Sequence, residues 1–225
     1  MTTEHWSGTL LLARDFALLH GSAGVTQAHA HYAHQLLLSP DAPVELLLDG
    51  KRVVARHILI ESMREHAIVA APPSLYTLYA EPLTIDASTL GSIGADWPSV
   101  EALVDALKRL PRRVMGDARI AAALAEVDAL LDGKVRAADI AARAQLSLSQ
   151  LERLFAAHVG VPVRRLVRWR RLRLALALAL AGETLTHAAH EAGFADSAHF
   201  SHAMREMFGV RADRALPGLS LRLID

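Results

Sequence analysis

A pattern that occurs twice, about fifty residues apart, constrains the fold of this 225-residue chain more than any other feature. The stretch "LSLSQLERLFAAHVGV" (146–161) returns as "FADSAHFSHAMREMFGV" (194–210). In each copy, apolar residues at helical spacing predict a short helix, a tight turn and a second helix that packs back on the first. This is the outline of a helix-turn-helix unit, whose second helix can enter the major groove of DNA.

The segment between the two copies strengthens this interpretation. Residues 163–181 predict a helix of about 19 residues, which at 1.5 Å per residue spans about 28 Å, against about 34 Å for one turn of B-DNA. Two second helices at this separation could enter successive major grooves on one face of the duplex. A single helix-turn-helix outline is more often plain helix packing, but two copies joined by such a helix favour DNA binding. The segment carries Arg164, Arg165, Arg168, Arg170, Arg171 and Arg173, which suit phosphate contacts or pairing with carboxylates.

The charge of the chain is unevenly distributed, although its formal net charge is zero. Residues 1–110 hold 7 Lys and Arg against 12 Asp and Glu, a net charge of −5, and the remainder holds 17 against 12, a net charge of +5. A neutral total therefore does not argue against an anionic partner, because the local field decides binding.

Composition excludes several classes of protein. The chain has no cysteine, which excludes disulfides and thiolate metal sites. Its N-terminus lacks the basic start and apolar core of a signal peptide, and its most apolar run, 172–182, is too short to cross a membrane. We therefore expect a cytoplasmic protein with no membrane partner.

The first part of the chain reads as strands. From Gly8 to about Pro82, short apolar runs alternate with turn signals, which is typical of a small sandwich or barrel. The Asp49-Gly50 pair between two such runs predicts a hairpin with a type I′ turn, because that turn needs positive φ at both central residues.

A change of pattern follows at 91–98, where glycine and proline precede a helical period. In 98–110 the residues Val100, Leu103, Val104, Leu107 and Leu110 form one apolar stripe, which predicts an amphipathic helix. The stripe could pack on its own barrel or form the seam of a dimer, since one stripe does not identify its partner. Residues 111–117 read as a linker.

The repeat also carries a family resemblance. The stretches "DIAARAQLSLSQLERLFAAHVGVP" and "GFADSAHFSHAMREMFGV" resemble the two helix-turn-helix units of the DNA-binding domain of AraC-type transcriptional regulators, over about Asp117 to Arg214. The resemblance implies an α+β protein of two domains: a cupin-like sensor β-barrel (1–90), the amphipathic helix and linker (91–116), and an all-α domain (117–225) with two helix-turn-helix units joined by a linker helix. It also implies docking in two grooves and a regulatory role.

Site residues follow from the same resemblance. Arg153 matches the base-reading arginine of the family, and its guanidinium suits bidentate contact with guanine. His202 stands where an arginine is common, so we expect the second unit to read sequence weakly. Asp196 is expected to cap its helix, and the absence of the usual proline and tyrosine after Gly209 puts the closing helix in doubt. The expected DNA contacts are Ser149, Gln150, Glu152, Arg153, Arg168, Ser197, Ala198, His199 and His202.

Histidines mark a second candidate site in the first domain. His29 and His31 stand two apart, so in a strand both point to one face, and Gln35 follows at even spacing. With His66, they could bind a divalent metal, and their spacing resembles the first metal motif of cupins with Gln35 in place of glutamate. The alternative is that His29, His31, Gln35 and His66 line a pocket that never holds metal, since glutamine removes a charge and "ESMREH" lacks the proline and glycine of the second cupin motif.

Three functions remain open on this evidence. The first is a transcriptional regulator, not an enzyme, whose cupin-like domain senses a small molecule or a metal and whose helical domain binds double-stranded DNA as a homodimer. DNA binding itself requires no cofactor, and RNA polymerase is a candidate partner. The second is a metal-dependent cupin enzyme with an accessory helical domain. The third is an architectural DNA binder whose barrel only dimerises.

Overall fold

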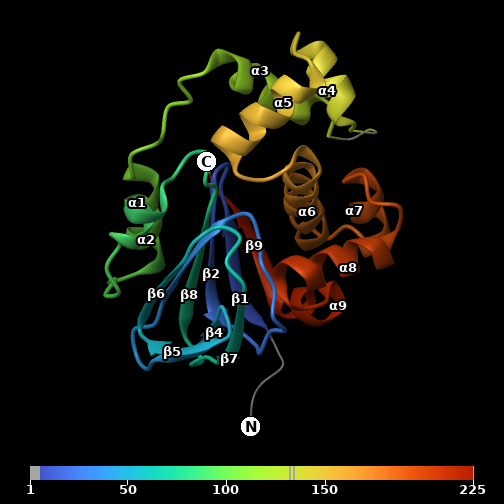
Figure 1. The fold of residues 1–225 in the computed structure, drawn as a ribbon. Helices are drawn as coiled ribbons and strands as arrows, with labels where there is room; N and C mark the ends of the chain where they lie inside the picture. Colours follow the sequence, from blue (N-terminus) through green and yellow to red (C-terminus); the bar gives the residue numbers. More distant parts are fainter. Residues whose placement is uncertain (1–5, 132, 134, 225) are drawn as a thin grey trace. The chain divides into compact units, whose positions relative to one another are not determined.

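The computed structural model describes residues 6–131, 133 and 135–224. These residues form two compact units (Figure 1). The first unit comprises residues 1–112 together with 204–225, and the second comprises residues 113–203. The sequence placed the domain limits at 1–90, 91–116 and 117–225, and the assignment of a role to each domain stays a prediction. Residues 1–5 and 225 lie outside the described residues. A β-rich N-terminal region and a helical C-terminal region confirm the two-domain α+β fold.

The β-rich unit consists of two sheets. A six-stranded sheet has the order β6-β3-β8-β2-β1-β9, and a three-stranded sheet has the order β5-β4-β7. The strand pattern predicted a small sandwich or barrel, and the pairing of the described strands gives two sheets. The strands are β1 (Ser7–Leu12), β2 (Phe16–Ser22), β3 (His34–Leu38), β4 (Val44–Leu48), β5 (Lys51–Ala55), β6 (His57–Ile60), β7 (His66–Ala70), β8 (Leu75–Ala80) and β9 (Leu219–Leu223).

The hairpin between β4 and β5 confirms the strongest turn prediction. Asp49 and Gly50 form its two-residue loop with φ values of 49° and 73°. Positive φ at both central positions is the conformation of a type I′ turn, whose twist matches that of the flanking strands.

The amphipathic helix packs on its own domain. Helix α1 (Ala87–Gly91) and α2 (Val100–Arg109) follow β8 (Figure 1). Leu103, Val104 and Leu107 of α2 are buried in one core cluster with strand residues such as Phe16 and Leu18. Val100 and Leu110, the other two stripe residues, are partly buried against the same cluster. The structure therefore supports packing of the stripe on its own domain, and a homodimer stays a prediction.

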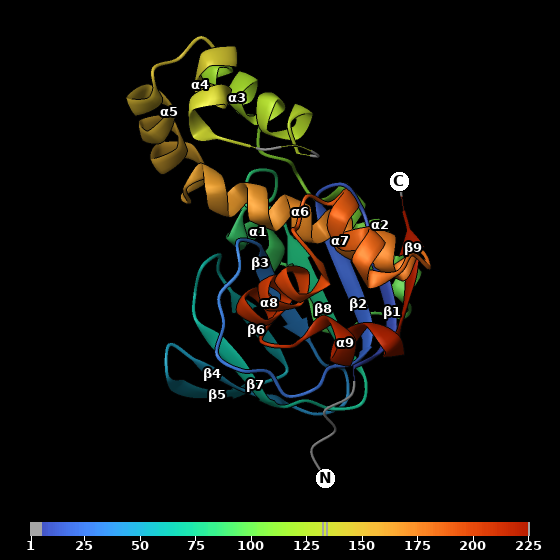
Figure 2. The same ribbon diagram turned by 90° about the vertical axis from the view of Figure 1, so that its right-hand side faces the viewer.

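The helical unit contains the repeat. Its helices are α3 (Ala118–Ala129), α4 (Ala137–Arg143), α5 (Leu148–Leu154), the π-helical turn η1 (Phe155–Val159), α6 (Val163–Leu180), α7 (Leu185–Glu191) and α8 (Ser197–Phe208), the last of which continues into the β-rich unit. Figure 2 shows α3, α4 and α5 gathered at one end of α6 and α7 at the other. Within the described residues, none of the helices has both the length and the apolar character needed to cross a bilayer.

The segment after α8 completes the β-rich unit. Helix α9 (Ala212–Ala215), a single turn, is present where the sequence left a closing helix in doubt, and the 3-10 turn η2 (Leu216–Gly218) leads into β9. Strand β9 pairs in parallel with β1. The sequence prediction placed these residues in an all-α domain, and this is a correction: parallel pairing between the two ends of the chain joins them to the first sheet.

Candidate DNA-binding surface and histidine cluster

The first helix-turn-helix unit consists of α4 and α5. Its turn is closed by the amide of Leu146, which donates to the carbonyl of Ala141 at 2.8 Å, and Gln145 adopts a φ of 55°. The hydroxyl of Ser147 accepts from the amide of Gln150 at 3.2 Å, and the Gln150 side chain accepts from the amide of Ser147 at 2.8 Å. This capping box satisfies two amides that would otherwise lack partners at the start of α5.

The second unit, α7 and α8, repeats this construction. The amide of Phe194 donates to the carbonyl of Ala189 at 2.9 Å, and Gly193 has a φ of 76° at the position equivalent to Gln145. The carboxylate of Asp196 accepts from the amide of His199 at 2.7 Å. Asp196 therefore caps α8, as predicted.

Helix α5 exposes the side chains expected to reach DNA. Leu151, Leu154 and Phe155 are buried, as predicted for the core. Ser149, Gln150, Glu152 and Arg153 are exposed, as is the apolar Leu148. The capping box engages the side-chain oxygen of Gln150, a structural role that the sequence reading missed although "SLSQ" is its signature.

Helix α8 has a comparable first turn. Phe200 and Met204 are buried, Ser197 is half-buried, and Ala198, His199 and His202 are exposed. The ring of His199 meets the ring of Phe194 edge-on at 5.3 Å, which orients this side chain at the start of the helix.

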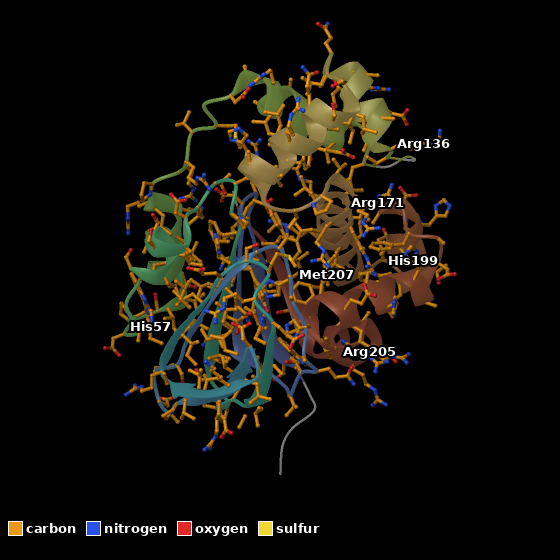
Figure 3. All side chains as sticks on the ribbon, in the orientation of Figure 1. His57, Arg136, Arg171, His199, Arg205 and Met207 are labelled. Atoms are coloured by element: carbon orange, nitrogen blue, oxygen red, sulfur yellow. The ribbon has the colours of Figure 1, made fainter. Side chains whose placement is uncertain are left out.

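Two arginines of α6 hold the unit together instead of facing outward. Arg170 pairs with Asp128 of α3. Arg171 donates to the carbonyls of Leu131 at 3.1 Å, Gly193 at 2.9 Å and Gly133. It thus ties the end of α3 to the turn of the second unit, and Figure 3 marks Arg171 on α6 and His199 on α8. Sequence alone gave no signal for this role, because the carbonyls come from distant segments. Arg168, an expected DNA contact, is half-buried.

The three candidate histidines come together in the β-rich unit. His29, His31 and His66 are 7%, 2% and 2% exposed, and one nitrogen from each lies within 4.8 Å of the other two. An isolated antiparallel bridge pairs His29 with His66, which is the first residue of β7. The expected strand around His29 and His31 is absent from the described residues, since β3 begins only at His34, but the two side chains still face one site.

Burial keeps these imidazoles neutral. It lowers the pKa of His29 to about 4, with repulsion from His66 as a second cause, and it also lowers the pKa of His31 and of His66. Each Nδ1 lies within hydrogen-bond distance of a backbone carbonyl, namely Gln27 at 2.7 Å, Ala33 at 3.0 Å and Arg64 at 2.9 Å. A carbonyl only accepts, so a neutral ring that donates from Nδ1 presents a lone pair at Nε2.

The Nε2 atoms of His66 and His31 have different surroundings. Nε2 of His66 is buried and has no hydrogen-bond partner among the described residues. Nε2 of His31 lies 3.1 Å from the side-chain oxygen of Gln35, whose amide nitrogen lies 3.4 Å from the hydroxyl of Tyr79. A neutral imidazole has one N–H, so His31 can donate to Ala33 or to Gln35 but not to both.

The chemistry of this cluster fits a divalent cation. Each ring has a backbone carbonyl within hydrogen-bond distance of Nδ1, and a ring that donates to it carries its lone pair on Nε2. Neutral imidazoles supported in this way are the usual ligands of zinc. Zinc–nitrogen bonds of about 2.0–2.1 Å place neighbouring ligand atoms about 3.3 Å apart in a tetrahedron. The candidate ligand atoms of the cluster, which lie within 4.8 Å of one another, are therefore farther apart than they would be around a bound zinc ion.

Residues from the C-terminal segment also meet the cluster, which the sequence reading did not anticipate. The ring of Phe208 lies 5.7 Å from that of His31 and 5.5 Å from that of Tyr79. Beside it, a cavity of about 360 Å³ is lined by Val25, Thr26, Gln27, Arg205, Gly209, Val210, Arg211 and Arg214. Contacts across more than 120 residues leave no local signal in the sequence.

Comparison with known proteins agrees with this geometry. A family model described as "Helix-turn-helix domain" matches residues 140–215. No curated protein matches. Fatty-acid-bound ToxT from Vibrio cholerae strain SCE256 is similar in fold, with a TM-score of 0.60, 15% identity, and coverage of 92% of this chain and 98% of that chain. ToxT from Vibrio cholerae O395 bound to (E)-4-(8-methylnaphthalen-1-yl)but-3-enoic acid gives a TM-score of 0.57, 12% identity, and coverage of 88% and 97%.

Proposed function

We propose that this chain is a DNA-binding transcriptional regulator of the AraC type. In this proposal its helix-turn-helix domain reads two adjacent DNA boxes, and the protein responds to an effector bound in its β-rich unit. One observation carries the DNA-binding part. Two helix-turn-helix units share the same turn hydrogen bond and the same kind of helix cap, and each exposes the first turn of its second helix. The 18 residues of α6 between them span about 27 Å.

Within this proposal the two units have unequal roles. Arg153 on α5 is exposed and suited to a guanine edge, so we assign it base reading. Ser149, Gln150 and Glu152 frame it on the same exposed face. On α8, Ser197, Ala198, His199 and His202 offer small or neutral groups, so we assign the second unit mainly to positioning, with Arg168 as a phosphate contact.

The test selects bound sequences from random DNA duplexes with the purified full chain. We expect a motif of two boxes whose centres are about 10–10.5 base pairs apart, one helical turn. Selection of a single short box would show that only one of the two helix-turn-helix units recognises the DNA sequence. Absence of any enriched motif would favour the architectural binder and contradict sequence-specific regulation.

We further propose that a divalent metal is the effector. His29, His31 and His66 would hold it, with Gln35 as a neighbouring oxygen donor, and the ion would supply a charge and a fixed geometry at a buried point. The unpartnered, buried Nε2 of His66 supports this assignment. We place the site in a regulator and not in an enzyme because it belongs to a chain that carries a DNA-binding domain.

Zinc titration against a competing chelating dye tests the metal. We expect one equivalent of zinc per chain in the native protein and none in His66→Ala. His57→Ala is the matched control, because His57 is an exposed histidine of the same unit, on β6. Zinc binding that survives His66→Ala would refute the site, and catalytic turnover by the zinc-loaded protein would favour the cupin enzyme.

A second effector class is supported by a different observation. The two ToxT structures hold carboxylic acids, and the cavity beside the histidine cluster is lined by Arg205, Arg211 and Arg214. An arginine-lined cavity suits a carboxylate, so a fatty acid is the alternative effector. Calorimetric titration with an unsaturated fatty acid, compared with Arg214→Ala, distinguishes it from the metal. We also propose that the protein acts in the cytoplasm as a homodimer and that it contacts RNA polymerase.

A further inference from the structure

The C-terminal end of α8 is docked on the loop that carries His29. The amide of Gln27 donates to the carbonyl of Gly209 at 3.0 Å, and the guanidinium of Arg205 donates to the side-chain oxygen of Gln27 at 2.9 Å. Gln27 in turn accepts, through its carbonyl, from Nδ1 of His29 at 2.7 Å. An unbroken chain of hydrogen bonds therefore joins the end of α8 to a histidine of the cluster.

We infer that this docked segment, Arg205 to Gly209, and a metal ion at the histidine cluster oppose each other, so that metal binding releases the end of α8. The inference rests on the proposed metal site and adds its regulation. It concerns the β-rich unit, to which residues 204–225 belong.

The first reason why docking opposes metal binding is the distance between the ligand nitrogens. The ligand nitrogens lie within 4.8 Å of one another, whereas zinc requires about 3.3 Å, so they must approach by up to about 1.5 Å. The docked segment holds the backbone of Gln27, and Gln27 holds the ring of His29. Closing the cluster around an ion therefore strains the hydrogen bond between the amide of Gln27 and the carbonyl of Gly209.

The second reason is that the docked segment restricts access to the histidine cluster. All three histidines are buried, and the ring of Phe208 lies against His31 and Tyr79. A metal site needs an entry path, and movement of this segment would open one. Docking thus opposes both the geometry of the loaded site and access to it.

Release of this segment would reach the DNA-binding residues through α8 itself. The helix is continuous from Ser197 to Phe208. Its first two turns carry the side chains that we expect to face the groove, and its last turn carries the docking contacts. His202 therefore lies only about 10 Å along the helix from Gly209. A two-state contact at one end of a helix can bias the freedom of the other end.

The internal repeat provides a matched pair of variants. Gly209 and Gly160 occupy equivalent positions, with φ values of 66° and 77°. A Cβ at Gly209 would lie 2.3 Å from the carbonyl oxygen of Gln27 and 2.7 Å from Nδ1 of His29. At Gly160 no described atom lies within 4 Å of the same position. Gly209→Ala and Gly160→Ala therefore introduce the same strain of an L-residue at positive φ. Only Gly209→Ala also places a Cβ that prevents the end of α8 from docking on Gln27.

The first experiment measures zinc affinity of the full chain by competition with a chelating dye. We expect Gly209→Ala to bind zinc at least fivefold more tightly than Gly160→Ala, because it has lost the docked state that opposes the ion. Arg205→Ala, an exposed change that should not affect folding, is expected to bind about two- to fivefold more tightly than Arg214→Ala. Equal or weaker zinc binding in both test variants would overturn the inference.

The second experiment follows docking directly by amide exchange in the NMR spectrum. The Gln27 amide is bonded to Gly209, while the neighbouring His29 amide is bonded to His66 at 3.0 Å. Zinc should accelerate exchange at Gln27 at least tenfold and leave His29 protected. Linkage also requires that zinc change the DNA affinity of the native protein, and change that of Gly209→Ala less.

The outcomes separate this inference from the proposed function. A protein that selects a DNA motif and binds zinc at His66, but shows no change at Gln27, refutes the coupling alone. A protein that selects a motif but binds no zinc refutes the metal effector and the coupling together. A protein that selects no motif refutes the proposed function itself.

Discussion

Replacing Gly193 by alanine should destabilise the second helix-turn-helix unit through two separable effects. Gly193 has a φ of 76°, and an L-residue in this conformation costs about 1–2 kcal/mol. The new Cβ would also lie 2.7 Å from Cζ of Arg171 and 2.8 Å from its Nε. Arg171 would have to move and give up at least one charge-assisted hydrogen bond, worth about 1.5–3 kcal/mol.

The expected total for Gly193→Ala is a loss of about 2.5–5 kcal/mol in the free energy of unfolding of the helical unit. Urea denaturation followed by circular dichroism at helical wavelengths measures it. The matched change in the first unit is Gln145→Gly, where a non-glycine residue has a φ of 55°. That variant should gain about 0.5–1 kcal/mol, since it removes the same strain at the cost of greater freedom in the unfolded chain.

A double-mutant cycle isolates the contribution of Arg171. In an Arg171→Ala background the steric conflict is gone, so Gly193→Ala should cost only the backbone strain of about 1–2 kcal/mol. The coupling between the two positions should then be about 1.5–3 kcal/mol. Equal cost of Gly193→Ala in both backgrounds would show that Arg171 does not hold this turn, and the reasoning would fail.

Three further predictions concern other elements. Arg153→Ala should weaken binding to the selected DNA motif by about 1–3 kcal/mol with little change on random DNA, and His202→Ala should cost less; fluorescence anisotropy measures both, and equal loss on random DNA would make Arg153 a phosphate contact. Ser147→Ala should remove about 1 kcal/mol of stability from α5 by breaking its capping box, seen in urea denaturation, whereas Ser147→Asp should retain the cap. Gly50→Ala should cost about 1–2 kcal/mol, since its φ is 73° but no described atom lies within 4 Å of the added Cβ; a larger thermal shift than Gly209→Ala would contradict this.

Local patterns in the sequence predicted their parts of the structure well. The Asp49-Gly50 hairpin, the cap at Asp196 and both helix-turn-helix units depend on residues within a few positions of one another, and the structure confirms them. Each of these signals works because turn and cap preferences are properties of short segments.

Long-range contacts explain what the sequence did not predict. The pairing of β9 with β1 joins residues such as Gly8 and Leu219, and no pattern in "LSLRL" specifies a partner so far away. The three carbonyls that Arg171 binds and the docking of Gly209 on Gln27 are of the same kind. The three histidines do come together as their pattern indicated, while metal binding stays a prediction.

The pairing of β9 with β1 has a consequence for biosynthesis. Because β9 is translated after every other strand, β1 leaves the ribosome long before its partner exists, and the whole helical unit is made in the interval. During that time the nascent sheet exposes unpaired backbone groups along β1, the kind of edge on which other chains can add. A ribosome that stalls within the helical unit would therefore leave the β-rich unit with an unpaired edge strand, which other chains could join, and with a dependence on chaperones.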